Sequence, residues 1–546
     1  MSGPVGEYAF APDERPLLPG GPFIPAHSPR RRLEYGLAGT VIGIVATLPN
    51  SLITVNVPNL PGPLGLDLTQ VSWLPAIFVA IVATSNLTLA KARIQFGFAA
   101  VTTVLLIANS LAALSQLIWS GFITAVVTRA VNGLTTASLI ALCSYYMLEA
   151  FPLKYRIWGS MATIGLAQLG APLARLVPLD VLAMDNGRGL HVIEPTLCLF
   201  LLALIRLTPL PPGERSEAFE PTDFLTIGLA VPAMVLLCGV LGLGRLYWWT
   251  DAPFLGWMLL GCIPLFAGAF IIESHRARPL LQLDWLTTSD ILRFAGVAFL
   301  VRIALAEQTY GSVGLLTSGG LTNDQLHTLF AIVALAIVAG LIVSCLTYSK
   351  DGLVKQVAVA ALIIALGAFL DSGANNLTRP HQLYLSQALI GFGTTLFICP
   401  AFIYIFFKMM LKGASHFISF VVLFAATQNI GALAGSALLG SYETIQARYH
   451  ATYLAEHLSL ADPQVVQRLQ AGTNTVASVL PDSTLRTAEG VALLGQKLSA
   501  EANILAFNDV FRLVAVLAFL TALHLVYRIT RTAWSERRQA QADTFA

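Results

Sequence analysis

Long apolar stretches separated by short polar segments set the pattern of this 546-residue chain. Between Tyr35 and Ile529, fourteen stretches are each long enough to cross a bilayer, whose hydrocarbon core takes roughly 20 residues of apolar helix. Backbone groups cannot stay unpaired in lipid, so we expect helices rather than open strands. The pattern predicts an all-α membrane protein with spans at residues 35–57, 71–90, 98–117, 121–149, 157–177, 190–208, 223–243, 253–272, 289–312, 326–347, 354–371, 383–407, 415–440 and 508–530.

Composition agrees with a membrane protein and narrows the function. The chain is 56% hydrophobic and 11% charged, with a mean hydropathy of +0.71, whereas soluble domains carry about 25% charged residues. A net charge of +2 does not favour nucleic acid as a partner. All six cysteines lie in apolar stretches without a CxxC pair or a Cys/His cluster, so we expect no disulfide and no metal site. The sequence has no nucleotide-binding loop or catalytic triad, so we expect neither an enzyme nor a bound cofactor.

Lysine and arginine recur in alternate loops, and this predicts the orientation in the membrane. With the N-terminus inside, every inner segment is basic, from Arg30–Arg32 through Lys91 and Arg93 to Arg528–Arg538, while the short outer loops hold few basic residues. We therefore expect an even number of spans and two cytoplasmic termini. The first 30 residues are rich in proline and glycine and lack the apolar core of a signal peptide, so they are predicted to form a flexible cytoplasmic leader.

The spans group as six, two and six, with linkers over 207–223 and 273–284 around the middle pair. This predicts a cytoplasmic tail over 1–34, an N-terminal six-helix bundle over 35–208, a linker with two extra helices over 209–284, a C-terminal six-helix bundle over 285–530, and a second tail over 531–546. The C-terminal bundle includes a long outer loop, 441–507, with apolar positions at helical spacing. Two six-helix halves suggest a transporter whose substrate path lies between them.

Short motifs stand at matching places along the spans. The segments are LPNSLITVNVPNLPGPLGLDLTQVSWL (48–74) with Pro58 and Trp73, AKARIQFGF (90–98) with Gly97, RAVNGLTTASLIAL (129–142) with Arg129 and Gly133, GLAQLGAPLARL (165–176) with Gly170 and Pro172, PLLQLDWL (279–286), and QNIGALAGSALLG (428–440). Together with the order of the spans, they resemble the major facilitator superfamily, specifically its fourteen-span drug:proton antiporter branch, the EmrB-like efflux pumps.

The resemblance implies a major facilitator fold, in which two six-helix bundles are joined by two additional spans. It also implies structural roles in close helix packing for a set of small or helix-bending residues, which are Gly97, Gly133, Gly165, Gly170 and Pro172.

The sequence departs from the family pattern at three places. Pro49 stands where the family has a membrane-embedded aspartate. The loop at 90–98 keeps Lys91 and Arg93 but lacks the family's acidic partner, and Arg175 replaces a glycine of the antiporter motif. These departures leave the coupling to protons open.

Charges inside the spans mark candidate functional residues, because each costs at least about 2.5–3.5 kcal/mol at mid-bilayer. Glu307 lies well inside span 9 and is our candidate proton carrier, since the span 1 acid is missing. The alternative is that span 9 ends earlier and Glu307 sits near the outer surface. Arg129 is the second proton-coupling candidate, because the resemblance implies that its position faces the central cavity. The alternative is a structural arginine held by carbonyl groups.

The substrate-cavity candidates are Arg302, Asn132, Gln428 and Asn50. Arg302 lies about 140° around the helix from Glu307, so no direct pair is expected between them, and a structural role is its alternative. Four further polar residues are expected at the outer interface, which are Arg175, Arg188, His191 and Glu194.

These observations predict a secondary active transporter, with proton-coupled efflux of small amphipathic or anionic, drug-like compounds as the leading function. The alternatives are a proton-independent facilitator or uptake permease, and a non-transporting membrane scaffold. Expected partners are a small-molecule substrate, protons and the lipid bilayer. The resemblance also implies a bacterial inner membrane, a periplasmic adaptor (membrane-fusion) protein and an outer-membrane channel. Loop 441–507 would help to dock the adaptor, and its alternative is a poorly ordered connector.

Overall fold

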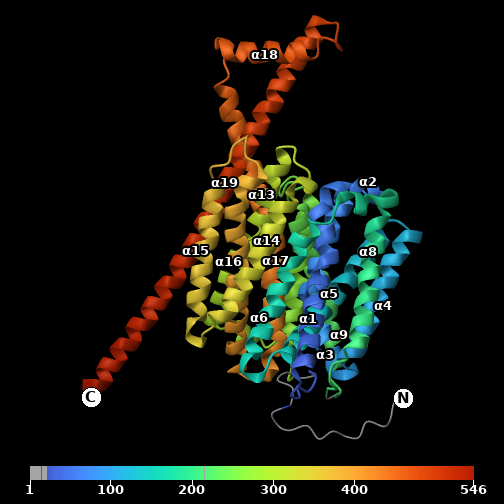
Figure 1. Ribbon diagram of the computed structural model, residues 1–546, viewed down its shortest axis with the longest axis vertical. Helices are drawn as coiled ribbons and strands as arrows, with labels where there is room; N and C mark the ends of the chain where they lie inside the picture. The colour runs from blue at the N-terminus through green and yellow to red at the C-terminus, as the bar shows by residue number, and fades with distance from the viewer. Residues whose placement is uncertain (1–13, 15–20, 214, 546) are drawn as a thin grey trace.

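The protein is a bundle of long helices. The computed structural model describes residue 14 and residues 21–213 and 215–545, without the side chains of 63, 179, 182–188, 414 and 536–545. Figure 1 shows the helices running side by side, and the continuous described chain, from residue 21 on, begins at one end of the bundle. We call this end the tail end, and the opposite end the projection end.

The first half of the bundle packs around α5, which contacts α1, α3 and α4, while α4 also contacts α8. Its helices are α1 (Pro29–Asn56), α2 (Pro61–Leu64), α3 (Leu68–Phe96), α4 (Phe98–Ile118), α5 (Phe122–Ala150), α6 (Arg156–Leu166), α7 (Gly170–Ala174) and α8 (Leu179–Leu207). The Ser28 side chain accepts a hydrogen bond from the Arg31 amide and caps α1, so the helix begins before the predicted residue 35.

Part of the predicted flexible tail is folded against the first half. Ile24 is 4% exposed, Pro22 forms a bridge with Gly213, and the His27 ring lies 2.7 Å from a carboxylate oxygen of Glu149. This part is ordered because the apolar side chain of Ile24 is buried and the His27 ring contacts the buried Glu149. The expectation of a flexible leader is wrong for residues 21–28, and most of residues 1–20 lie outside the described chain.

The second half packs around α15, α16 and α19, and α12 lies against α17. Between the halves, α9 and α10 pack on each other, and α9 also contacts α3 and α17. The helices are α9 (Pro221–Leu243), α10 (Pro253–Ser274), α11 (Leu283–Leu286), α12 (Ser289–Ala304), α13 (Glu307–Ser318), α14 (His327–Leu346), α15 (Leu353–Asp371), α16 (Tyr384–Met410), α17 (Phe417–Glu456), α18 (Pro463–Thr475) and α19 (Ser483–Phe545).

Twelve of the described helical segments are long and apolar enough to cross a membrane. The other two predicted spans, 157–177 and 289–312, correspond to interrupted helices: a 3-10 turn separates α6 from α7, and Leu305 and Ala306 separate α12 from α13. The all-α fold is confirmed, and the count of fourteen spans stays a prediction.

The segment predicted as an outer loop over 441–507 is mostly helical. The helix α17 continues to Glu456, beyond the predicted end at residue 440, and α19 begins at Ser483, well before residue 508. Figure 1 shows that these extensions and α18 stand clear of the bundle. We call residues 441–507 the projection.

Candidate functional site

A cavity of about 390 Å³ lies between the two halves. Its walls come from α1, α3 and α5 to α7 of the first half, and from α12, α16 and α17 of the second. The lining runs from Arg156 and Phe417, in the first turns of α6 and α17, to Ala171 in α7. The cavity therefore occupies the middle and the tail-end part of the interface.

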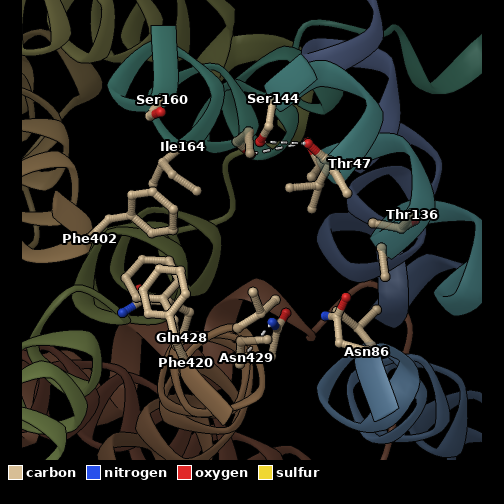
Figure 2. A pocket seen from close by; sticks show the side chains of 18 of the residues that line it. Thr47, Asn86, Thr136, Ser144, Ser160, Ile164, Phe402, Phe420, Gln428 and Asn429 are labelled. Atoms are coloured by element: carbon tan, nitrogen blue, oxygen red, sulfur yellow. Dashed lines mark hydrogen bonds between the residues drawn. The ribbon is translucent and has the colours of Figure 1, made fainter. Parts of the chain in front are cut away.

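The cavity is lined by hydroxyl, amide and aromatic side chains and carries positive charge. Figure 2 shows Thr47, Thr136 and Asn86 on one side, and Phe402, Phe420 and Gln428 on the other. Three arginines, Arg93, Arg156 and Arg302, reach the lining, whereas no carboxylate does within the described part of the chain. The site is therefore built to accept an amphipathic ligand without positive charge.

Three of the four substrate-cavity candidates line this cavity: Asn50, Arg302 and Gln428. The Nε atom of Arg302 donates to the backbone oxygen of Gln428 at 3.1 Å. The side-chain oxygen of Asn50 and both polar atoms of the Gln428 side chain are buried without a hydrogen-bond partner. Candidate Asn132 lies elsewhere.

Asn132 and Arg129 belong to a buried cluster around Glu194, inside the first half. Arg129 is 2% exposed and forms an ion pair with Glu194 of α8. Asn132 and Asn109 donate to the other carboxylate oxygen of Glu194, at 2.7 and 3.1 Å. Neither Arg129 nor Asn132 is part of the described cavity lining. The expectation that Glu194 is interfacial is wrong, because three donors stabilise its charge inside the bundle.

Arg175 is not at the outer interface either. It is 6% exposed, and its guanidinium lies 5.0 Å from the ring centre of Phe330 in the second half. Arg175 and Asn323 also hydrogen-bond to each other. The Arg175 guanidinium already contacts the Phe330 ring face and the Asn323 amide, so the side chain does not extend to water. The expectation that Arg175 is interfacial is therefore wrong. The Arg188 side chain lies outside the described residues.

Glu307 is fully buried and shares one partner with a second acid. The Nε2 atom of Gln387 donates to Glu307 Oε1 at 3.1 Å and to Asp371 Oδ2 at 2.7 Å. Asp371 is 2% exposed and Gln387 1% exposed, and Glu307 Oε2 has no hydrogen-bond partner. Glu307 therefore does not sit at the surface. It opens α13 directly after the break that follows α12, the helix that carries Arg302 into the cavity.

Lys91 lies in the loop that lacks the family's acidic residue, and its acidic partner comes from the extra helix α9. Lys91 Nζ lies 2.6 Å from Asp223 Oδ2, and Asp223 Oδ1 lies 2.7 Å from Arg276. Arg276 also pairs with Glu273 at 2.8 Å and with Glu220 at 2.9 Å. Burial alone would lower the pKa of Arg276, but its hydrogen bonds to Asp223, Glu220 and Glu273 raise it above the usual value. This network holds α9 and α10 to α3.

The motif glycines lie at close helix contacts. A Cβ at Gly133 would stand 3.1 Å from Ile81 of α3, and one at Gly165 would stand 2.7 Å from Leu341 of α14. Gly170 faces Thr47 of α1, next to the buried Pro172. Gly97 has φ +84°, a left-handed conformation that lets the chain turn from α3 into α4.

Sequence reasoning missed Asp371, Gln387 and the aromatic wall of the cavity. Asp371 stands at the predicted end of span 354–371, where a charge costs less than at mid-bilayer. Gln387 is uncharged, so the cost of placing a charge in the bilayer, which was the criterion for the charged candidate residues, did not apply to it. Phe402 and Phe420 lie in long apolar stretches, where an aromatic side chain is not distinguished from its apolar neighbours. The available signal was that three acceptor or donor side chains, Glu307, Asp371 and Gln387, fall near the same end of neighbouring spans.

The chain matches no family model and no curated protein. In three dimensions it is similar to the peptide transporter POT in complex with sulfate (TM-score 0.55, 15% identity, 91% of this chain and 95% of that chain). It is also similar to a POT family transporter in complex with 5-aminolevulinic acid (0.53, 14%, 92% and 96%) and to the nucleoside transporter NupG (0.52, 9%, 91% and 99%). The likeness shows a major facilitator-like fold. The EmrB-like branch stays a prediction.

Proposed function

We propose that this protein is a secondary active transporter that moves small amphipathic or anionic compounds by alternating access. The observation that carries the proposal is the cavity whose walls come from both halves and extend to the tail end of the bundle. Beyond the other end of the cavity, Arg175 and Asn323 join the halves. A site reached from one end and shut at the other is one of the two states that alternating access needs.

The orientation proposed from the basic loops makes this state open to the cytoplasm, with both termini inside and the projection on the outer face of the inner membrane. A substrate would then enter from the cytoplasm and leave on the far side once the halves rock about the cavity. The described cavity corresponds to the inward-accessible state in which an exporter would take up its substrate, and the export direction itself is proposed from the resemblance to efflux pumps.

Proton coupling is supported by the buried acids in the second half. Glu307 and Asp371 share one amide, so the loss of both protons would leave two negative charges in an apolar setting with a single donor between them. We propose that Glu307 takes up and releases the coupled proton beside Asp371. Because Glu307 follows the break after α12, a change in its charge can move the helix that carries Arg302.

Transport in proteoliposomes separates the proposal from its alternatives. An imposed pH gradient should drive substrate movement, and the E307Q variant should lose this dependence. Movement that ignores the gradient would indicate a facilitator or permease, and no movement of any tested compound would indicate a scaffold. The exposed D324N variant, in the same half, serves as the matched control.

We also propose that the projection docks a periplasmic adaptor protein. Its apolar side chains Leu460 and Val479 are 73% and 78% exposed, so a partner protein that contacted them would bury apolar surface. A photo-reactive residue at position 460 should cross-link to a co-expressed membrane-fusion protein. Cross-linking with equal yield from Leu377, which is exposed outside the projection, would contradict this proposal.

A further inference from the structure

We propose, resting on the transporter function above, that the cavity selects organic anions with an aromatic body. Arg302 and the side-chain amide of Gln428 bind the anionic group, and the aromatic body lies against Phe402, Phe420 and Phe424. This narrows the substrate class from amphipathic compounds in general to one charge type and one body type, and it gives each part of the ligand its own contacts.

The charge of the lining favours an anion. Arg93, Arg156 and Arg302 line the cavity without a lining carboxylate in the described chain. Charges interact more strongly in a partly enclosed site than in bulk water. A cationic ligand would face three like charges with no counter-charge on the walls, whereas an anion would be attracted by all three.

Of the three lining arginines, Arg302 is the one whose two terminal nitrogens are available to a ligand. Its Nε donates to the Gln428 backbone at 3.1 Å, and its Cβ and Cγ pack against Gly431, where an added Cβ would stand 2.9 Å from the Arg302 Cβ. No described residue accepts a hydrogen bond from its two terminal nitrogens, and no ion pair engages it. A carboxylate or sulfonate can bind both nitrogens through two parallel hydrogen bonds.

The other two arginines already have partners. Arg93 donates to the Ala137 backbone at 3.2 Å and lies over the Phe98 ring at 4.8 Å. Arg156 donates to the Ile24 backbone at 3.4 Å. Arg93 and Arg156 add positive potential to the cavity, and Arg302 makes the direct contact with the anion.

Gln428 supplies a second polar contact beside Arg302. Both polar atoms of its side chain are buried and have no hydrogen-bond partner. Buried polar groups are nearly always paired in folded proteins, and an unpaired one is costly. A ligand oxygen that accepts from both Arg302 and Gln428 Nε2 would pair the unpaired donor of this side chain, while Gln428 Oε1 would need a donor elsewhere on the ligand.

The aromatic wall stands next to these two residues. The ring centre of Phe402 lies 5.2 Å from that of Phe420 and 4.9 Å from that of Phe424. Figure 2 shows Phe402 and Phe420 on the same side of the pocket as Gln428. Flat rings bind such faces by stacking or by edge contacts. A volume of about 390 Å³ is near the lower limit for ligand pockets and suits a molecule of one or two rings.

Calorimetric binding to the purified, full-length protein tests the proposal without transport. The probes are 2-naphthoate, its uncharged amide 2-naphthamide, and 2-naphthylmethylammonium, which share one aromatic body. We expect 2-naphthoate to bind at least about 10-fold more tightly than the amide, and the ammonium compound to bind weakest. Equal binding of the three probes, or tighter binding of the cation, would overturn the proposal.

Variants locate the contact. R302Q should weaken 2-naphthoate about 10-fold and leave 2-naphthamide unchanged, and R302K should recover part of the loss. R293Q, on an exposed face of the same helix, is the matched control. Equal losses for both probes in a folded R302Q protein would contradict an anion contact at Arg302. Selective binding without transport would leave this inference standing and reject the transporter function instead.

Discussion

Arg175 of the first half and Asn323 of the second half hydrogen-bond to each other twice. Arg175 Nη1 donates to Asn323 Oδ1 at 3.0 Å, and Asn323 Nδ2 donates to the Arg175 backbone oxygen at 3.3 Å. Asn323 is 7% exposed, nearly as buried as Arg175. The pair closes the interface on the projection side of the cavity, at a position where the resembled family has glycine. It must separate before the cavity can open on that side.

Loss of this pair should open the projection end more often. We expect N323A to increase the rate at which a membrane-impermeant maleimide, added at the projection side, labels a cysteine placed at Asn50. One hydrogen bond from the charged guanidinium and one to a backbone oxygen together contribute about 2–4 kcal/mol to the closed state, so an increase of about 10-fold or more is expected. The measurement is a labelling time course in a background without the partly exposed Cys345.

N376A is the control for this experiment, because Asn376 is exposed at the same end and its side chain bonds only to Glu501 among the described residues. Equal labelling rates in N323A and the unchanged protein would show that the pair does not hold the interface shut.

The two acids should act as one proton site. E307Q and D371N should each abolish proton release on substrate binding, because each leaves Gln387 between one acid and one amide. The measurement is the absorbance of a pH dye in weakly buffered detergent solution. D324N should release protons as the unchanged protein does. Normal release from E307Q would exclude Glu307 as the carrier.

The Arg129–Glu194 pair should contribute mainly to stability. E194Q leaves a buried guanidinium without its counter-charge, which costs about 3–5 kcal/mol. We expect a lower melting temperature in detergent, and partial recovery in the R129M/E194M double variant, which removes both charges. A melting temperature that does not change while transport is lost would instead support the proton-coupling role first assigned to Arg129.

The attachment of the folded tail segment should weaken in acid. Burial, and then the nearby charges of Arg31, Arg32 and Arg156, lower the pKa of His27 below its ordinary value of 6.5, even though a carboxylate oxygen of Glu149 lies 2.7 Å from the ring. The unfolded segment therefore binds a proton more readily. The free energy that His27 contributes is present above pH 6.5 and is lost as the pH falls toward the folded-state pKa.

Hydrogen exchange of residues 21–28 measures this effect, after correction for the intrinsic pH dependence of exchange. Protection should fall between neutral pH and about pH 5, and the H27Q variant should show a flatter profile. A profile that is identical in both proteins would show that His27 does not contribute, and would assign the attachment to Ile24 and to the bridge between Pro22 and Gly213.

The order of the helices could be predicted because the length of an apolar span is set by the bilayer and is local in sequence. The burial of Glu307 could be predicted for the same reason. The partners of the buried charges could not be predicted. Glu194 is 65 residues from Arg129, and Asp223 is 132 residues from Lys91. Only helix packing brings such pairs together.

The same limit explains the two arginines whose surroundings were misjudged or left open. The position of Arg175 along its helix indicated the end of the bundle opposite the chain's beginning, where the structure has it, but whether a long side chain turns to solvent or across the interface depends on Asn323 and Phe330 of the other half. Arg302 reaches the cavity because Gly431 on α17 leaves room for its stem. Neither neighbour can be inferred from the local pattern.

A cross-link between positions 175 and 323 tests the central claim most directly. The R175C/N323C variant, joined by a short bifunctional reagent in proteoliposomes, should bind ligand in the cavity but transport none, and cleavage of the linker should restore transport. Transport that continues at the full rate while the two halves are joined at this end would contradict alternating access through the cavity.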